Sequence, residues 1–98
     1  MIGCDIVDMN RFKQRQERWA CRVLTEKEQE EYAKRTDKLE YLAGRWAVKE
    51  AIYKASGLLS GFDVLTAANG KPIVCGINGV YVSISHEKTH AFAVALVK

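Results

Sequence analysis

Proline, cysteine and long apolar runs are scarce in this sequence, and each scarcity excludes a class of protein. The single proline among 98 residues argues against a proline-rich linker or a disordered chain. The three cysteines are odd in number and form no C-x-x-C pair, which argues against a disulfide framework and a zinc site. The longest apolar run, 91–97, is much shorter than the roughly 20 residues of a membrane helix. We therefore expect a cytoplasmic protein that does not span a membrane.

The remaining composition is typical of one globular domain, residues 1–98. Apolar residues make up 48% and charged residues 28%, enough for a core and a solvated surface. The formal charge of +3 is too small for a polycation, and the aromatic residues form no stacking pattern on the expected strands, so we expect no nucleic acid partner. The position of the charges therefore matters more than their sum.

Capping patterns predict a helical first half. A capping box at 25–28 opens a helix that reaches about residue 34. The pattern recurs at 37–40 and predicts a long central helix that can run to residue 56, with Gly57 as its left-handed C-terminal residue.

Alternating apolar residues predict strands at both ends of the chain, at 2–7, 63–67, 73–75, 81–85 and 91–97. An N-terminal strand, a helical half and then antiparallel strands indicate an α+β fold. In the last strand we expect bulky Phe92, Val94 and Leu96 to face the core. The opposite, alanine-lined face would then admit a close neighbour, either a helix or another subunit.

One carboxylate interrupts the apolar pattern of the central helix. A helical wheel places Glu50 near the centre of a stripe formed by Leu39, Leu42, Ala43, Trp46 and Tyr53. A carboxylate on a core-facing stripe must be paired or bound to a cation, because burying it alone is very unfavourable. A structural ion pair and a metal site both remain open.

Asp5 interrupts the first strand in the same way, on the face that carries Gly3. Two carboxylates without Cys or His ligands favour a hard cation such as Mg²⁺, with substrate phosphates completing its shell. Arg45, Lys49 and Lys54 border Glu50 and are candidates for phosphate binding, although such a run can also be a solvated helix face.

A second cluster of positive charge lies at 9–22, where basic residues far outnumber the one acidic residue, Glu17. Asp8 is expected to cap a short helix here that carries Met9 and Phe12. This stretch could dock an acidic protein helix or could be an ordinary solvated amphipathic face.

Successive segments resemble, in order, the motifs of the holo-acyl-carrier-protein synthases, the small bacterial 4′-phosphopantetheinyl transferases. Residues 3–7 resemble the G-x-D-[IV] opening, and residues 22–28 resemble the R-x-L-T-x-x-E segment. Residues 42–55 resemble the hallmark L-A-x-R-[FW]-[AS]-x-K-E-A-x-x-K-A. Residues 69–72 and 82–86 resemble the later N-G-K-P and [VI]-S-[IL]-[ST]-H motifs.

The resemblance implies a 4′-phosphopantetheinyl transferase-like fold and a transferase of fatty acid biosynthesis. The enzyme would transfer 4′-phosphopantetheine from coenzyme A to a serine of apo acyl carrier protein and release adenosine 3′,5′-bisphosphate. Asp5 and Glu50 would bind Mg²⁺, and Asp5, Glu50 and Lys54 would be the catalytic residues. Coenzyme A would be bound by Arg45, Lys49, Lys54, Gly57, Lys71, Pro72 and His86. The carrier protein would be bound by Met9, Arg11, Phe12 and Arg15.

The resemblance further implies a homotrimer with its sites between subunits. The sequence departs from the family in the loop at 57–61, which is shorter and less rich in glycine. An inactive transferase-like module that only binds an acidic carrier protein is the main alternative. A Mg²⁺-dependent phosphohydrolase would share the two carboxylates and is a further alternative.

Overall fold

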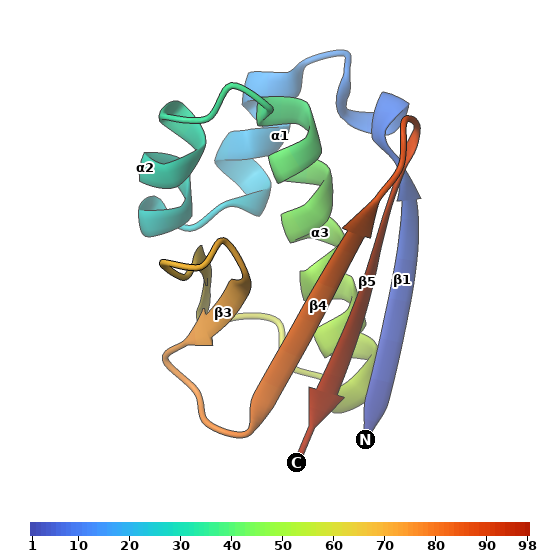
Figure 1. Ribbon diagram of the computed structural model, residues 1–98, viewed down its shortest axis with the longest axis vertical. Helices are drawn as coiled ribbons and strands as arrows, with labels where there is room; N and C mark the ends of the chain where they lie inside the picture. The colour runs from blue at the N-terminus through green and yellow to red at the C-terminus, as the bar shows by residue number, and fades with distance from the viewer.

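A three-stranded antiparallel sheet and one long helix packed across it form the frame of the molecule (Figure 1). The computed structural model describes all of residues 1–98. Its elements are β1 (Ile2–Asp8), the 3₁₀ helix η1 (Met9–Phe12), α1 (Gln16–Val23), α2 (Glu26–Ala33), α3 (Lys38–Ser56), β2 (Asp63–Thr66), β3 (Pro72–Cys75), β4 (Val80–His86) and β5 (His90–Val97). The sheet has the order β1-β5-β4, so β5 is central, and β2 and β3 form a separate antiparallel hairpin. The predicted α+β class is confirmed.

The sheet and α3 lie very close together because the residues between them are small. Ala91, Ala93 and Ala95 of β5 are fully buried. A Cβ atom built on Gly3 of β1 would lie 2.1 Å from the carbonyl oxygen of Ala51, so only glycine fits there. The helix therefore packs against the alanine face of β5.

This packing corrects the prediction for the last strand. The bulky residues Phe92 and Leu96 face away from α3 and remain exposed, whereas the alanine face is the core face. The side chains alternated as predicted, but the alternation could not tell which face the helix covers. A helix at short range needs small partners, and that requirement outweighed the preference for burying large ones.

The outer face of the sheet is consequently apolar and open. Pairing of the strands sets Ile2 beside Leu96 and Ile6 beside Phe92, and Tyr81 of β4 lies opposite Leu96. All five side chains are exposed, Ile2 to 73% and Ile6 to 64%. An apolar patch of this kind on a small protein marks an interaction surface.

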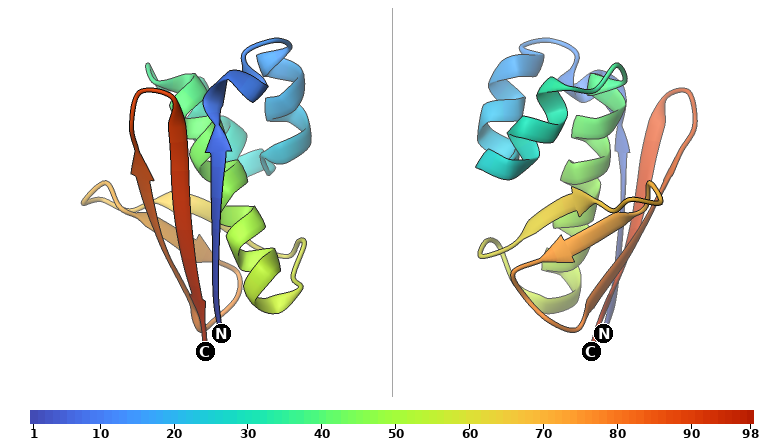
Figure 2. Two further views of the ribbon diagram at one scale, coloured as in Figure 1. Left: turned by 90° about the vertical axis from the view of Figure 1, so that its right-hand side faces the viewer. Right: turned by 60° about the vertical axis from the view of Figure 1, so that its left-hand side comes forward.

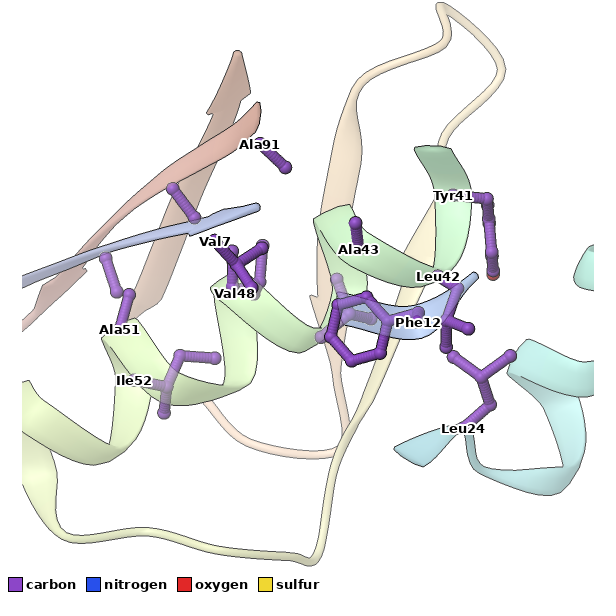
Figure 3. Close-up of a cluster of buried hydrophobic side chains, with 14 of the residues drawn as sticks. Val7, Phe12, Leu24, Tyr41, Leu42, Ala43, Val48, Ala51, Ile52 and Ala91 are labelled. Atoms are coloured by element: carbon purple, nitrogen blue, oxygen red, sulfur yellow. The ribbon is translucent and has the colours of Figure 1, made fainter. Parts of the chain in front are cut away.

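The second side of α3 is covered by α1, α2 and the β2–β3 hairpin, so most of the helix is buried all round (Figures 1 and 2). The close-up in Figure 3 shows Val48, Ala51 and Ile52 of α3 between β1 and the loop before β2, and Phe12 beside Leu42. This arrangement corrects the predicted stripe. Tyr53 is exposed and Glu50 is half-buried at the rim, because a helix buried on several sides has no single apolar stripe.

Most predicted helix ends are confirmed. Thr25 caps α2 through the hydrogen bonds of a capping box with Glu28, and Gly57 ends α3 in the left-handed conformation with φ of 78°. Asp37 precedes α3 but makes no capping bond, because its carboxylate instead accepts both hydrogen bonds of the Arg35 guanidinium. None of the helices has both the length and the apolar character needed to cross a bilayer.

Candidate functional site

Asp5 and Lys54 meet where β1 crosses the last turns of α3. Lys54 Nζ donates to Asp5 Oδ1 at 3.0 Å and to the carbonyl oxygen of Cys4 at 3.1 Å. Asp5 faces α3, in the same cross-strand row as Ala93, and its side chain is 15% exposed, against 53% for Lys54. The hydrogen bond to the Asp5 carboxylate and the charge of that group raise the pKa of Lys54. Lys54 is therefore a cation at neutral pH, with one side open to solvent.

Glu50 lies one turn before Lys54 on α3. It is half-buried and makes no ion pair or side-chain hydrogen bond within the chain. It lines a cavity of about 430 Å³ between α1 and α3, which is enclosed by Trp19, Arg22, Val23, Trp46, Lys49, Glu50, Tyr53 and Leu59. A carboxylate without a partner at the rim of a cavity is free to bind a ligand.

The donors available for a cation are these two carboxylates. No cluster of three or more His, Cys, Asp or Glu side chains occurs in the chain. A pair of carboxylates suits Mg²⁺, which commonly takes one or two protein oxygens and fills its other positions with water and substrate phosphates. The residues present therefore fit a substrate-bridged magnesium ion, whereas they do not fit a closed structural metal site.

Arg45 and Lys49 are two of the predicted phosphate-binding residues, but other groups of the protein already bind their charged ends. Arg45 is 6% exposed, and its guanidinium donates to the Val64 carbonyl at 3.0 Å and to Thr66 Oγ1 at 2.9 Å. It also pairs with Glu31 at 3.5 Å and stacks on the Tyr41 ring, with its central carbon 4.2 Å from the ring centroid. Arg45 is thus a structural cation within the single chain, and its phosphate contact stays a prediction.

Lys49 donates to Glu28 Oε1 and to the Val23 carbonyl, both at 2.6 Å. The Glu28 side chain is completely buried. Sequence reasoning used Glu28 only as a capping residue and missed Glu31. The signal was present, since acidic residues at 28 and 31 and basic residues at 45 and 49 repeat along their helices at spacings that put each pair on one face.

The other predicted coenzyme A residues lie elsewhere. Gly57 is exposed at the end of α3. Lys71 and Pro72 lie at the turn and start of β3, in the hairpin whose tip extends past the β4 edge of the sheet (Figure 2). His86 ends β4, where its Nδ1 lies 3.5 Å from Glu40 Oε1. Asp5 is on β1, at the opposite edge, so the predicted residues form two separate groups within one chain.

The predicted carrier-binding residues also divide. Phe12 is fully buried and Met9 nearly so, and both belong to the hydrophobic core, so their docking role stays a prediction. Arg11 and Arg15 are exposed. The Arg11 guanidinium stacks over Trp46 at 4.9 Å from the ring centroid. The basic surface is therefore supported by an aromatic ring and not by the two apolar residues of η1.

This surface continues along α1 toward the cavity. Arg15, Arg18 and Arg22 surround a smaller hollow with Trp19, and the Arg22 guanidinium lies 5.7 Å from the Trp19 ring centroid. Since Trp19 and Arg22 also line the cavity beside Glu50, the basic surface and the unpartnered carboxylate border the same cavity.

One long helix packs on a small sheet, each of the two carries a carboxylate, and Lys54 bonds to the carboxylate of the sheet. Comparison with known proteins identifies the class to which this fold belongs. The model of the 4′-phosphopantetheinyl transferase superfamily matches residues 1–97, and the chain belongs to that family. The predicted resemblance is confirmed.

Curated relatives carry the name holo-[acyl-carrier-protein] synthase. The chain is 40% identical to the one from Exiguobacterium sibiricum, over 99% of this chain and 87% of that protein. It is 37% identical to the one from a Geobacillus species, over 99% and 94%.

Solved structures agree with the fold. A holo-(acyl-carrier-protein) synthase from Bacillus anthracis, in complex with coenzyme A (3′,5′-ADP), superposes with a TM-score of 0.86. It is 34% identical, and the match covers 98% of this chain and 93% of that chain. The enzyme from Helicobacter pylori in complex with coenzyme A gives a TM-score of 0.81 at 27% identity, with full coverage of both chains.

Proposed function

We propose that this protein transfers 4′-phosphopantetheine from coenzyme A to a serine of an apo acyl carrier protein. The observation that carries the proposal is the free carboxylate of Glu50, open to a cavity and one turn from the Asp5–Lys54 pair. Family membership and the coenzyme A complexes of similar proteins support the same reaction. Three unpaired cysteines, two of them exposed, fit the reducing cytoplasm that we propose as its location.

In this reaction the serine oxygen attacks the β-phosphorus of coenzyme A, and the bond to the leaving adenosine 3′,5′-bisphosphate breaks. Such transfers need positioning and neutralised charge more than covalent help from the protein. Lys54 is a cation at neutral pH, as an ordinary lysine is, and Asp5 raises its pKa further, so it can neutralise charge on the leaving phosphate. Glu50 can accept a hydrogen bond from the serine hydroxyl, orient it for attack and take its proton as the new bond to phosphorus forms.

Asp5 and Glu50 would together hold Mg²⁺, which supplies Lewis-acid stabilisation of the pyrophosphate when bound. The support is chemical, since both ligands are carboxylates and no nitrogen or sulfur ligand accompanies them. Lys54 already holds Asp5 Oδ1 in a hydrogen bond, which fixes the orientation of that carboxylate before any ligand arrives.

We propose that the carrier protein docks on α1, through exposed Arg11 and Arg15 and their neighbours Arg18 and Arg22. Guanidinium groups on an open surface attract an acidic partner and speed its encounter. The cavity that α1 and Glu50 both line would bring a serine on that partner to the reacting carboxylates.

We further propose a homotrimer in which neighbouring chains complete each site. The apolar outer face of the sheet supports self-association, because exposed isoleucine, phenylalanine and leucine side chains gain free energy when they are covered. The split of the predicted residues supports a shared site, since Lys71, Pro72 and His86 lie across the sheet from Asp5.

The transfer is tested by incubating the protein with apo acyl carrier protein, coenzyme A and Mg²⁺ and weighing the carrier by mass spectrometry. We expect the mass of one phosphopantetheine to be added, and no addition with EDTA. Carrier binding without any mass gain would instead identify an inactive binding module. Release of inorganic phosphate without a carrier would identify a phosphohydrolase.

The assembly is tested by light scattering after size exclusion. We expect the wild-type protein at three times the chain mass and the Phe92→Glu variant as a monomer with little activity. Lys88→Gln changes the net charge by the same one unit in the exposed β4–β5 loop and serves as the control. A wild-type monomer with full activity would exclude the shared site.

A further inference from the structure

The cavity beside Glu50 has two walls, and Lys49 links them through a hydrogen bond. Trp19, Arg22 and Val23 come from α1, whereas Trp46, Glu50 and Tyr53 come from α3. Lys49 of α3 donates from Nζ to the carbonyl of Val23, the last residue of α1, at 2.6 Å. This carbonyl belongs to a helix end, where no partner within the helix is available.

Lys49 is itself held by a buried acid. Its Nζ lies 2.6 Å from Glu28 Oε1, which also accepts from the backbone N–H of Thr25 at 3.0 Å. The second oxygen, Oε2, accepts from the Val64 N–H at 2.6 Å and so ties the pair to β2. Because the Glu28 side chain is 0% exposed and both its oxygens are occupied, Glu28 cannot touch a substrate.

These bonds leave Lys49 little freedom to bind coenzyme A. Two short, strong acceptors occupy the ammonium group, and the side chain is 19% exposed. Moving the ammonium to a phosphate would leave Glu28 buried without its cation, which is strongly unfavourable. Lys54, by comparison, is open to solvent.

We propose that Lys49, held by Glu28, is a positioning residue that fixes the separation of α1 and α3 and so aligns the carrier-docking helix with Glu50. It contacts neither coenzyme A nor the carrier. This inference rests on the proposed function, because it assigns α1 to the carrier protein and Glu50 to the reaction.

Tryptophan fluorescence can report on the cavity directly. The chain has two tryptophans, and both Trp19 and Trp46 line the cavity, with ring centroids 6.0 Å apart. Quenching of their fluorescence by acrylamide therefore reports access to the cavity without any substrate. This readout remains available if the transferase activity itself is absent.

The test compares Lys49→Met with Lys54→Met, a substitution of the same type five residues further along α3. We expect Lys49→Met to increase tryptophan quenching and to raise the KM for the carrier about tenfold, while the KM for coenzyme A stays within about twofold. Lys54→Met should lower kcat and leave tryptophan quenching unchanged.

Glu28→Asp weakens the same pair without removing a charge, and it provides a second variant in case Lys49→Met does not fold. We expect it to change quenching and the carrier KM in the same direction by a smaller factor. A tenfold rise in the KM for coenzyme A in Lys49→Met, with quenching and the carrier KM unchanged in both variants, would overturn the proposal. An inactive wild-type protein with the expected quenching changes would overturn the proposed function and leave the role of Lys49 in the cavity.

Discussion

Two pairs of charged residues on α3 lie within three turns of each other and have opposite surroundings. Arg45 and Lys49 point into the protein, where Glu31, Glu28 and backbone carbonyls satisfy them. Glu50 and Lys54 lie nearer the surface, where Glu50 has no partner in the chain and Lys54, although paired with Asp5, is half open to water. Charges satisfied by the fold hold the helix in place, whereas charges left open are available for chemistry.

The largest effect on stability is expected for Arg45→Met. The substitution leaves the Val64 carbonyl, Thr66 and Glu31 without their partner, and breaking one side of a buried pair costs about 3 kcal/mol. Urea unfolding should show this loss, while Lys54→Met should leave the urea midpoint nearly unchanged, because ion pairs open to solvent contribute little to stability. Equal losses in the two variants would erase the distinction between the pairs.

Glu50→Gln should have the reverse profile. We expect kcat to fall by about 100-fold or more, equivalent to about 2.7 kcal/mol of transition-state stabilisation, because the variant loses a negative charge at the site. The free energy of unfolding should stay within about 0.5 kcal/mol of the wild type, since Glu50 has no partner to lose. The mass-spectrometric transfer assay and urea unfolding check both halves. Normal turnover would make Glu50 a structural residue.

A smaller effect on stability is expected at acid pH, where Glu31 becomes protonated and its pair with Arg45 is lost. Burial acts to raise the pKa of Glu31, but hydrogen bonds from Thr66 and Tyr41 and the charge of Arg45 outweigh it and lower the pKa below 4.5. A carboxylate with a lowered folded pKa stabilises the fold above its ordinary pKa and loses this contribution as pH falls through the folded value.

The free energy of unfolding of the wild type, measured with urea, should therefore fall as the pH drops below about 4.5. Glu31→Gln should flatten that part of the pH profile. Glu30→Gln removes the same charge from the exposed side of α2 and is the matched control. Identical profiles for the two variants would argue against a role for Glu31 in the network.

The smallest effect is expected at Arg15, an open charge whose backbone is strained. Its φ of 59° is left-handed, which favours glycine, so Arg15→Gly should stabilise the fold by about 0.5 kcal/mol. The same change should raise the KM for the carrier, because a docking cation is lost. Arg18→Gly removes an equal charge inside α1 and should instead destabilise by about 1 kcal/mol. If both variants were less stable than the wild type, the claim that the backbone at Arg15 is strained would be wrong.

The sequence was most informative where local rules decide the outcome. The strand at 2–7, the Thr25 capping box and the end of α3 at Gly57 depend on neighbours along the chain, and all three are confirmed. The Asn69–Gly70 turn likewise lies between β2 and β3, with Gly70 at φ of 86°. Family motifs also drew attention to Asp5, Glu50 and Lys54, which the structure brings to one region.

Tertiary packing decided what the sequence could not. The burial of Phe12 depends on the aromatic rings of Trp19 and Trp46, which pack against it from other helices. Arg45 and Lys49 look like Lys54 in a helical motif, and only the partners that α2 and β2 bring to them separate the two kinds of cation. Asp37 was drawn from its cap by the Arg35 guanidinium, a competitor two residues away.

The alanine row of β5 has a consequence for the proposed magnesium site. Ala93 lies beside Asp5 in the sheet, and its methyl group is part of the layer that separates the strands from α3. Three methyl groups thus act as a spacer whose thickness sets how far the strand carboxylate stands from the helix carboxylate. Because backbone packing and not flexible side chains sets the separation of strand and helix, this separation should stay constant when ligands bind and leave. The size of cation that the site prefers would then be tuned by an alanine that never touches it.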